Sequence, residues 1–391
     1  MANDGDGAVA AASEFLAVPG AVDGSGPDAG VPAHYGNPLG EQRRLAAGEA
    51  VVDLSNRAVV SIAGPDRLSW LDSISSQRLV GLPPGESSET LLLDPNGHLE
   101  HAVRLIDDGE TLWLLVEGSE ARSLLDFLQR MRFMLRVEPA ERTTEFATIG
   151  SCAPPGSAQA PLVDAAVSNG IALVWHDPWS VVARGGHQYA TTDAHPGAGW
   201  TWTETLVPRS ALAGLAGRAA SGDLAVAGTL AVDALRIAAW RPRFATEVDE
   251  KTIPHELDWL RTAVHLSKGC YRGQETVAKV HNLGHPPRRL VLLHLDGSEG
   301  ALPAPGSPVS IDREGERRVV GQVTSSALHY ELGPIALAVL KRSTDATAPL
   351  HVDAAGVDVA AAQELIVPTD AGAEANVPRL PRLGGATRPR R

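Results

Sequence analysis

The sequence contains few cysteines, the residues on which disulfide frameworks, structural zinc sites and iron–sulfur clusters depend. Only two cysteines occur among its 391 residues, Cys152 and Cys270. Two such distant cysteines are too few for a disulfide framework, a structural zinc site or an iron–sulfur cluster with four cysteine ligands. Free thiols fit a reducing compartment, so we expect a cytoplasmic protein.

Long apolar runs and a surplus of basic residues are also missing. No apolar stretch approaches the ~20 residues that cross a bilayer, and the N-terminus lacks the basic and apolar regions of a signal peptide. The formal net charge is −13, which opposes a general nucleic-acid-binding surface. We therefore expect neither a membrane nor a nucleic acid as a partner.

The patterns that are present predict an α+β fold in several parts. Residues 1–45 are rich in Ala, Gly, Asp and Pro and are predicted to form a flexible N-terminal arm. Strand and helix patterns then predict two α+β domains, over 46–145 and 146–286. Short strands separated by Gly and Pro predict a β-barrel over 287–368. Residues 369–391 carry five arginines and are predicted to be a disordered basic tail.

One stretch concentrates reactive side chains and glycines, from Leu266 to Thr276. Gly269 and Gly273 bracket Cys270 in it, and a helix is predicted to begin at Gln274. A thiol just ahead of a helix N-terminus and close to a lysine, here Lys268, has a lowered pKa and reacts as thiolate. A single cysteine can equally be a packing residue, and at this point both interpretations stay open.

The string Lys268-Gly-Cys-Tyr-Arg-Gly-Gln-Glu275 resembles the signature K-G-C-Y-x-G-Q-E of the YgfZ-type folate-binding proteins. These are relatives of the glycine-cleavage T protein, an aminomethyltransferase, and are associated with the maturation of iron–sulfur enzymes. The resemblance implies an aminomethyltransferase-like folate-binding fold with a C-terminal β-barrel module. It also implies tetrahydrofolate as the cofactor and iron–sulfur enzymes as client partners. We expect Cys270 and Lys268 as catalytic residues, and cofactor-binding roles for Arg236, Glu256, Tyr271, Gly273, Gln274 and Glu275.

A second segment, Asp233 to Trp240, resembles the D-x-L-R-x-E-A-G segment of the wider family, with departures at Ala238 and Trp240. Its Arg236 could bind a carboxylate tail, for which a planar guanidinium is suited. Arg236 could instead form an ion pair with Asp233, three residues back on the same helix.

A third segment, Thr252 to Glu256, resembles the family's I-P-x-E. The Glu256 carboxylate could accept hydrogen bonds from two adjacent N–H groups of a pterin ring. It could equally be a carboxylate at the start of a helix after Pro254. Farther on, Gly321 to Ser325 resembles the G-x-V-T-S strand of the family's C-terminal barrel.

Three departures weigh against aminomethyl transfer. The transferases have a carboxylate after a hairpin turn, and His101 aligns with it here, although histidine can serve as a base. Residues 184–189 lie about where the family has G-E-D-G-F-E and lack its acids. Cys270 occupies a position that is acidic in the transferases. We expect no metal site, because no histidine pair has an H-E-x-x-H arrangement.

Two further functions remain open. One is a tetrahydrofolate-dependent aminomethyltransferase or demethylase, and the other is a non-catalytic folate-binding scaffold in which Cys270 only packs. Flat pterin rings stack on aromatic faces, so one or two of the tryptophans in the middle of the chain are candidates to line the cavity. They are Trp175, Trp179, Trp200, Trp202, Trp240 and Trp259.

Overall fold

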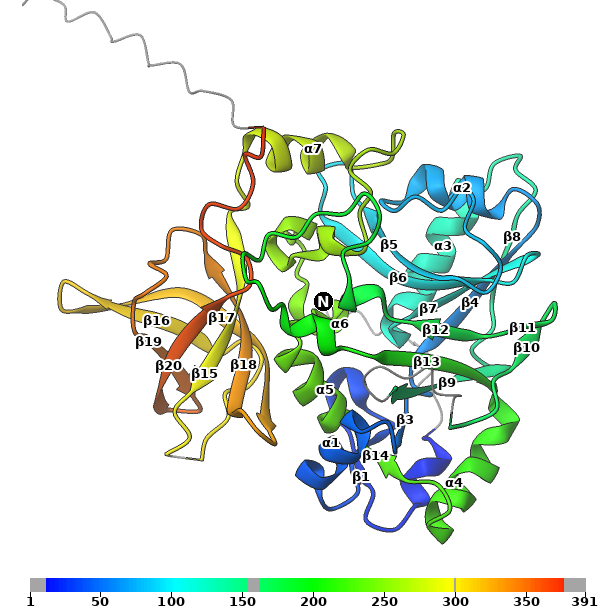
Figure 1. Ribbon diagram of the computed structural model, residues 1–391, viewed down its shortest axis with the longest axis horizontal. Helices are drawn as coiled ribbons and strands as arrows, with labels where there is room; N and C mark the ends of the chain where they lie inside the picture. Colours follow the sequence, from blue (N-terminus) through cyan, green and yellow to red (C-terminus); the bar gives the residue numbers. More distant parts are fainter. Residues whose placement is uncertain (1–11, 154–161, 299, 376–391) are drawn as a thin grey trace, which may run out of the picture.

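The computed structural model describes residues 12–153, 162–298 and 300–375 (Figure 1). A first five-stranded sheet has the order β5-β6-β7-β4-β8 and is antiparallel. Helices α2 (Arg67–Ile74) and α3 (Ala121–Met131) pack on one face of it. The strands are β4 (Ala58–Ala63), β5 (Ser87–Leu93), β6 (Leu99–Asp107), β7 (Thr111–Val116) and β8 (Glu138–Glu141).

A second five-stranded sheet has the order β12-β13-β9-β3-β14. Its strands are β3 (Val51–Asp53), β9 (Phe146–Cys152), β12 (Val174–His176), β13 (Trp202–Pro208) and β14 (Val226–Ala227). We expected two domains that meet between residues 145 and 146, but the boundary between the two sheets does not follow this position. β3 precedes the first sheet in sequence but pairs with β9 and β14 in the second.

Helices α1 (Pro38–Ala46), α4 (Leu212–Ser221) and α5 (Thr229–Ala238) accompany this second sheet. Two short strands, β10 (Val167–Ser168) and β11 (Ile171–Ala172), form a separate hairpin. Pro178–Ser180 is a 3₁₀ helix, η4, in which the Asp177 carboxylate accepts a hydrogen bond from the Trp179 backbone N–H.

The C-terminal part is a closed barrel with the strand order β15-β18-β17-β16-β19-β20, which confirms the α+β class with a β-barrel module. Its strands are β15 (Arg288–Leu295), β16 (Pro308–Arg313), β17 (Glu316–His329), β18 (Gly333–Lys341), β19 (Leu350–Ala354) and β20 (Val357–Leu365). The sequence did not predict β19 or β20 individually; in β20, three consecutive alanines are poor strand formers.

The N-terminal residues correct the expectation of a flexible arm over 1–45. Residues 12–45 form 3₁₀ helices η1 (Glu14–Ala17) and η2 (Gly26–Asp28), the strands β1 (Val22–Asp23) and β2 (Pro32–His34), and most of α1. Phe15 packs in the apolar cluster between the second sheet and α4. A flexible segment would not bury such a side chain. Residues 1–11 lie outside the described part.

The predicted disordered tail is also ordered where it is described. The backbone N–H groups of Glu374 and Ala375 donate hydrogen bonds to the carbonyls of His281 and Asn282, at the end of α7 (Gln274–Leu283). The remainder of the tail, 376–391, lies outside the described residues. Within the described residues, no helix has the length and apolar character needed to cross a bilayer.

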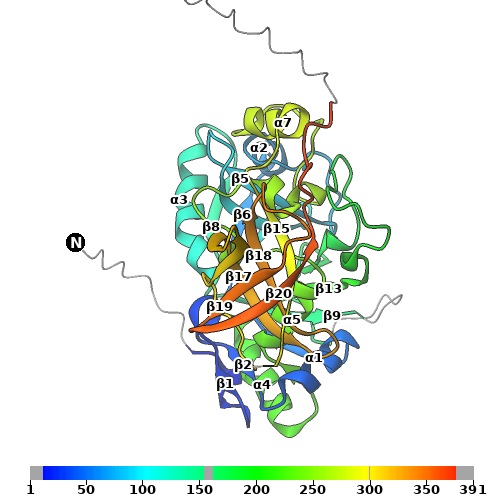
Figure 2. The same cartoon turned by 90° about the vertical axis from the view of Figure 1, so that its left-hand side faces the viewer.

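Short elements join the sheets to the barrel: α6 (Phe244–Glu247), η7 (Pro254–Leu257) and η8 (Trp259–Arg261). A large apolar cluster containing several tryptophans lies where the two sheets and the barrel meet. Helices α7 and α2 lie at the same end of the molecule in both views (Figures 1 and 2).

Candidate functional site

The signature loop, residues 266–273, leads directly into α7. Cys270 is exposed in it and forms no disulfide. Gly273 has φ +82°, and a Cβ there would lie 2.7 Å from the Asp94 carbonyl oxygen and 3.0 Å from the Cα of Gly97. The hairpin turn between β5 and β6 therefore packs on the backbone just before α7. Only glycine can adopt this positive φ without strain and also leave room for the neighbouring backbone.

Lys268 connects the signature loop to the C-terminal end of α2. Its ammonium donates hydrogen bonds to the carbonyl oxygens of Ser75 at 2.7 Å and Gln77 at 2.8 Å, and to that of Asp72. The side chain is only 2% exposed. Burial lowers the pKa of Lys268, and the nearby Asp72 carboxylate opposes that change. The contacts of Lys268 are structural, and its expected influence on Cys270 stays a prediction.

The other predicted residues of the loop lie close to Lys268. Its ammonium is 5.3 Å from the ring centroid of Tyr271, whose pKa is raised by burial. The Gln274 amide donates to the Lys268 carbonyl at 3.4 Å. Glu275 is exposed in the first turn of α7, where its charge suits the positive end of the helix. Their cofactor-binding roles stay predictions.

Glu256 is buried at the start of η7, away from the central cavity described next. One carboxylate oxygen accepts from the Ile253 N–H at 3.3 Å, and Arg288 donates to both oxygens. This arrangement matches the second interpretation of Glu256, as a carboxylate at a helix start, because both oxygens already have donors.

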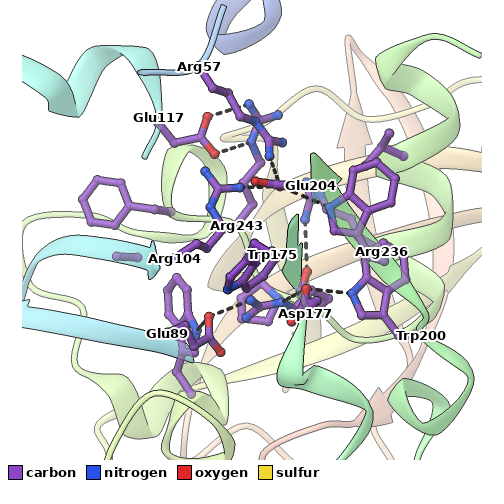
Figure 3. Close-up of a pocket in the computed structure, with 17 residues that line it drawn as sticks. Arg57, Glu89, Arg104, Glu117, Trp175, Asp177, Trp200, Glu204, Arg236 and Arg243 are labelled. Atoms are coloured by element: carbon purple, nitrogen blue, oxygen red, sulfur yellow. Dashed lines mark hydrogen bonds and ion pairs between the residues drawn. The ribbon is translucent and has the colours of Figure 1, made fainter. Parts of the chain in front are cut away.

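A small cavity lies where the two sheets face the α5–α6 connection (Figure 3). Its volume is about 60 Å³, and its walls combine tryptophans with charged side chains. The tryptophans are Trp175, Trp200, Trp202 and Trp259. The charged residues are Arg57, Arg104, Arg236, Arg241, Arg243, Glu89, Glu117, Asp177 and Glu204.

Arg236 is the one predicted cofactor-binding residue that lines this cavity. Its guanidinium donates to Asp233 at 2.6 Å and to Glu247 at 3.0 Å, and it reaches Ser325 of the barrel at 2.8 Å. The ion pair between Arg236 and Asp233, which was one of the two interpretations of Arg236, is therefore present. Arg236 also joins α5 to α6 and to the barrel.

Paired charges set the electrostatics of the cavity. Burial alone would raise the pKa of Glu117, but the charges of Arg243 and Arg57 bring it far below its usual value. Burial also acts to raise the pKa of Glu204, but the charges of Arg104 and Arg57 outweigh burial, and the pKa of Glu204 is lowered. Both carboxylates are thus ionised at neutral pH. Burial lowers the pKa of the Arg57 guanidinium, and the Glu204 carboxylate opposes that change.

Three polar atoms of this network have no hydrogen-bond partner although they are buried. They are Nε of Arg57, Nη1 of Arg241 and Oε2 of Glu204. Leaving such atoms unpaired costs about 1–3 kcal/mol each. Two donors and one acceptor beside four indole rings form a set that could bind the edge of a flat polar molecule.

The sequence reasoning did not identify Arg57, Glu204, Arg241 or Arg243. The sequence does contain one signal for Glu204. In Trp202-Thr203-Glu204-Thr205-Leu206, alternation places Glu204 on the same strand face as Trp202 and Leu206, which predicts that it is buried. A buried carboxylate needs a charged or hydrogen-bonding partner. Residues 184–189, which we aligned with the family's acidic stretch, lie elsewhere. Their backbone pairs with Leu260 and Leu266.

His101 is buried on β6 and its Nδ1 lies 3.1 Å from the Glu120 carboxylate, at the start of α3. Ala102 and Arg104 of the same strand line the cavity instead. Glu100 lies on the same face of β6 as Ala102 and Arg104, but its carboxylate pairs with Arg272 of the signature loop and does not line the cavity. Within the described part of the chain, no three His, Cys, Asp or Glu side chains are grouped to hold a metal ion.

Comparisons with known proteins agree with this architecture. No family model matches the chain. A solved aminomethyltransferase T of the glycine cleavage system from Bartonella henselae superposes with a TM-score of 0.69 at 17% identity, covering 91% of this chain and 96% of that one. This likeness shows the fold.

Sequence relatives narrow the assignment. The mitochondrial iron–sulfur cluster assembly factor IBA57 of Mus musculus is 27% identical over 325 residues, 76% of this chain and 79% of that protein. The aminomethyltransferase of Corynebacterium jeikeium is 25% identical over 345 residues, 80% and 84% of the two chains. This chain is a YgfZ-type relative of the aminomethyltransferases.

Coverage differs among the relatives of this YgfZ-type chain. A chloroplast protein of Arabidopsis thaliana, described as a transferase, is 25% identical over 302 residues. The match spans 74% of this chain but only 65% of the plant protein. The plant relative therefore has a substantial part with no counterpart in the match.

Proposed function

We propose that this protein binds tetrahydrofolate in the central cavity and assists the assembly or repair of iron–sulfur enzymes in the cytoplasm. In this proposal, the Cys270 thiolate is the group that contacts sulfur or a cluster on the client. The observation that carries it is the exposure of Cys270 on a loop held by Lys268 on one side and Gly273 on the other. An exposed thiol on a fixed backbone can meet an atom of another protein in a defined geometry.

Two further observations support this proposal. One sequence relative carries the name of an iron–sulfur cluster assembly factor. At the position where the transferases have a carboxylate, this chain has His101, and its ring faces Glu120 instead of the cavity. A chain without that acid is poorly equipped for aminomethyl transfer, which favours the assembly role.

The cavity residues fit the ring of a folate in their chemistry. The Glu204 carboxylate oxygen and the Arg57 and Arg241 N–H groups without partners would hold the polar edge of the ring between the tryptophans. Tetrahydrofolate, when bound, supplies a carrier for one-carbon units. The cavity volume of about 60 Å³ is below the ~300 Å³ at which ligand pockets begin. Side chains of the charged network must therefore shift on binding.

Calorimetry with tetrahydrofolate, combined with client-enzyme activity in a deletion strain, tests the proposal. The variants are Cys270→Ala and, as a matched control, Cys152→Ala, since Cys152 is the second thiol and is buried. We expect both variants to bind tetrahydrofolate like the parent protein. Only Cys270→Ala should fail to restore client activity.

Other outcomes point to the two alternatives. Full client activity of Cys270→Ala would overturn the thiolate role and indicate a folate-binding scaffold. Turnover of a methylamine donor with tetrahydrofolate by the purified protein would indicate a one-carbon transferase. Absence of tetrahydrofolate binding by the parent protein would overturn the folate part of the proposal.

A further inference from the structure

The segment after α3 exposes apolar side chains to an unusual degree. Met134 is 97% exposed and Phe133 is 79% exposed, and Leu135 follows directly. The chain has only five phenylalanines and three methionines. Single exposed apolar residues are ordinary on a protein surface, but three in a row that include two scarce residue types require an explanation. We refer to residues 130–136 as the apolar loop.

The backbone of the apolar loop is held in this conformation. Phe133 has φ +47°, a left-handed value that costs a non-glycine residue about 1–2 kcal/mol. The Leu135 N–H donates to the Arg132 carbonyl at 3.0 Å. At the end of the loop, the Arg136 guanidinium donates to both carboxylate oxygens of Asp66. The exposure of Phe133 and Met134 is thus a property of the fold.

Positive charge surrounds these apolar side chains. Arg130 and Arg132 are exposed, and neither has an ion pair with any described residue. Arg136 lies on the other side of Met134 and is 74% exposed. The chain as a whole carries −13, so the apolar loop is a local basic region on an acidic protein.

The apolar loop and the signature loop lie on neighbouring parts of the surface. Asp66, the partner of Arg136, precedes α2, and Lys268 donates to carbonyls at the other end of α2. Eight helical residues span about 12 Å. Arg272 of the signature loop also lies 5.8 Å from the ring centroid of Phe127, one turn before Met131 on α3. Figures 1 and 2 both place α2 and α7 at one end of the molecule.

We propose that the apolar loop is the docking surface for the client protein, which presents an apolar pocket rimmed by carboxylates. The proposal rests on the proposed function, because it names the surface that places a client beside Cys270. Phe, Met and Arg are the residues enriched at protein interfaces. Arginine forks bind carboxylates at short range.

Charge argues against the other occupants. An anionic membrane would meet a protein whose net charge is −13, and the two would repel each other. A second copy of the chain on a two-fold axis would bring Arg130 and Arg132 against the same arginines. A carboxylate-rimmed pocket places its negative charge only against the arginines of the loop, whereas a membrane plane would also extend over the acidic surface around them.

Two double variants test the docking surface: Phe133→Ser with Met134→Ser, and Arg130→Glu with Arg132→Glu. The matched control is Leu332→Ser, an exposed leucine of the barrel. Exposed substitutions change stability by about 0.5 kcal/mol or less, so all three proteins should fold. We expect both double variants to restore client activity at least five-fold less well than the parent or the control, with unchanged tetrahydrofolate binding. Restoration at the parent level by both double variants would overturn the inference.

Crosslinking separates this result from failure of the proposed function. A photoreactive phenylalanine analogue at position 134 of the full chain should give an adduct with an acidic protein, and Arg130→Glu with Arg132→Glu should abolish that adduct. If Cys270→Ala restores full client activity, the thiolate role fails, and the adduct still decides whether the loop docks a protein. No adduct, or adducts with lipid or with a second copy of the chain, would overturn the docking surface.

Discussion

Asp28 of the N-terminal segment accepts two hydrogen bonds from the guanidinium of Arg243, at 2.8 and 2.9 Å, across 215 residues of sequence. Arg243 also donates to both oxygens of Glu117. One guanidinium therefore joins the N-terminal segment, the end of β7 and the wall of the central cavity.

Asp28→Asn should loosen the N-terminal segment. The variant removes one of the two charges that compensate the buried Arg243. Because Glu117 still pairs with Arg243, we expect a loss of about 2 kcal/mol in the free energy of unfolding, the range of one hydrogen bond to a charged group. Limited proteolysis should cut residues 12–34 faster than in the parent. Asp23→Asn is the control, because Asp23 is exposed on β1 and accepts only from the Gly30 N–H. Equal cleavage in both variants would contradict the expectation.

Lys268→Met should destabilise the protein, whatever the chemistry of Cys270. The change leaves the carbonyl oxygens of Asp72, Ser75 and Gln77 without their donor, at a cost of about 2 kcal/mol or more. Urea unfolding measures it. Lys279→Met, at an exposed position of α7, should have an effect near zero, and a similar loss in both variants would show that the buried contacts are not the cause.

Gly273→Ala and Gly269→Ala form a matched pair in one loop. At Gly273 the added Cβ meets backbone atoms at 2.7 and 3.0 Å on a left-handed backbone, whereas at Gly269 it meets nothing within 4 Å. We expect a loss of about 1–3 kcal/mol for Gly273→Ala and a much smaller change for Gly269→Ala. The reaction rate of the Cys270 thiol with a chromogenic disulfide should change only in the first. A stable Gly273→Ala protein would mean that the loop can rearrange.

Asp258→Asn should stabilise the protein at alkaline pH. Burial raises the pKa of Asp258 to about 7, while an unfolded Asp has a pKa near ~3.9. The folded state thus holds the proton more tightly, and this contribution is complete below pH ~4 and is lost as the pH rises through 7. Asn keeps an acceptor for the Tyr189 N–H, tolerates the left-handed φ of +55°, and has no charge to bury.

Thermal unfolding at pH 5 and pH 8 checks this expectation. The advantage of the Asn variant over the parent should be larger at pH 8. An advantage that is equal at both values, or larger at pH 5, would show that Asp258 does not titrate as its burial implies.

Glu204→Gln tests the cavity as the folate site. Glu204 compensates Arg57 and Arg104 and has one oxygen without a partner. A hydrogen bond to a charged group contributes about 1.5–3 kcal/mol, so we expect tetrahydrofolate affinity to fall by at least ten-fold in calorimetry. Glu100→Gln, which breaks only the half-exposed pair with Arg272, should bind normally. Unchanged affinity of Glu204→Gln would place the ligand elsewhere.

The elements that the sequence predicted well are those with local causes. The helix predicted to begin at Gln274 is α7, and its start depends on residues that are neighbours along the chain, among them Gly273 with its left-handed backbone. The fold class and the barrel followed from such signals and from the resemblance.

The parts that escaped prediction depend on distant partners. Arg243 and Asp28 are each ordinary surface-type residues in the sequence, and only the fold buries them together. Glu204 is similarly defined by Arg57 and Arg104, from two other strands or their ends. Lys268 was noticed because of Cys270, yet its contacts lie with the end of α2. Periodicity carries no information on such pairings.

The membership of β3 in the second sheet has a consequence for biosynthesis. A ribosome delivers Val51–Asp53 well before β9 and β14, its two neighbours. A nascent chain that has completed the first sheet therefore still holds an unpaired edge and the apolar side chains of its own beginning in water. Translation that stops near residue 145 should leave a product that aggregates or is retained by a chaperone.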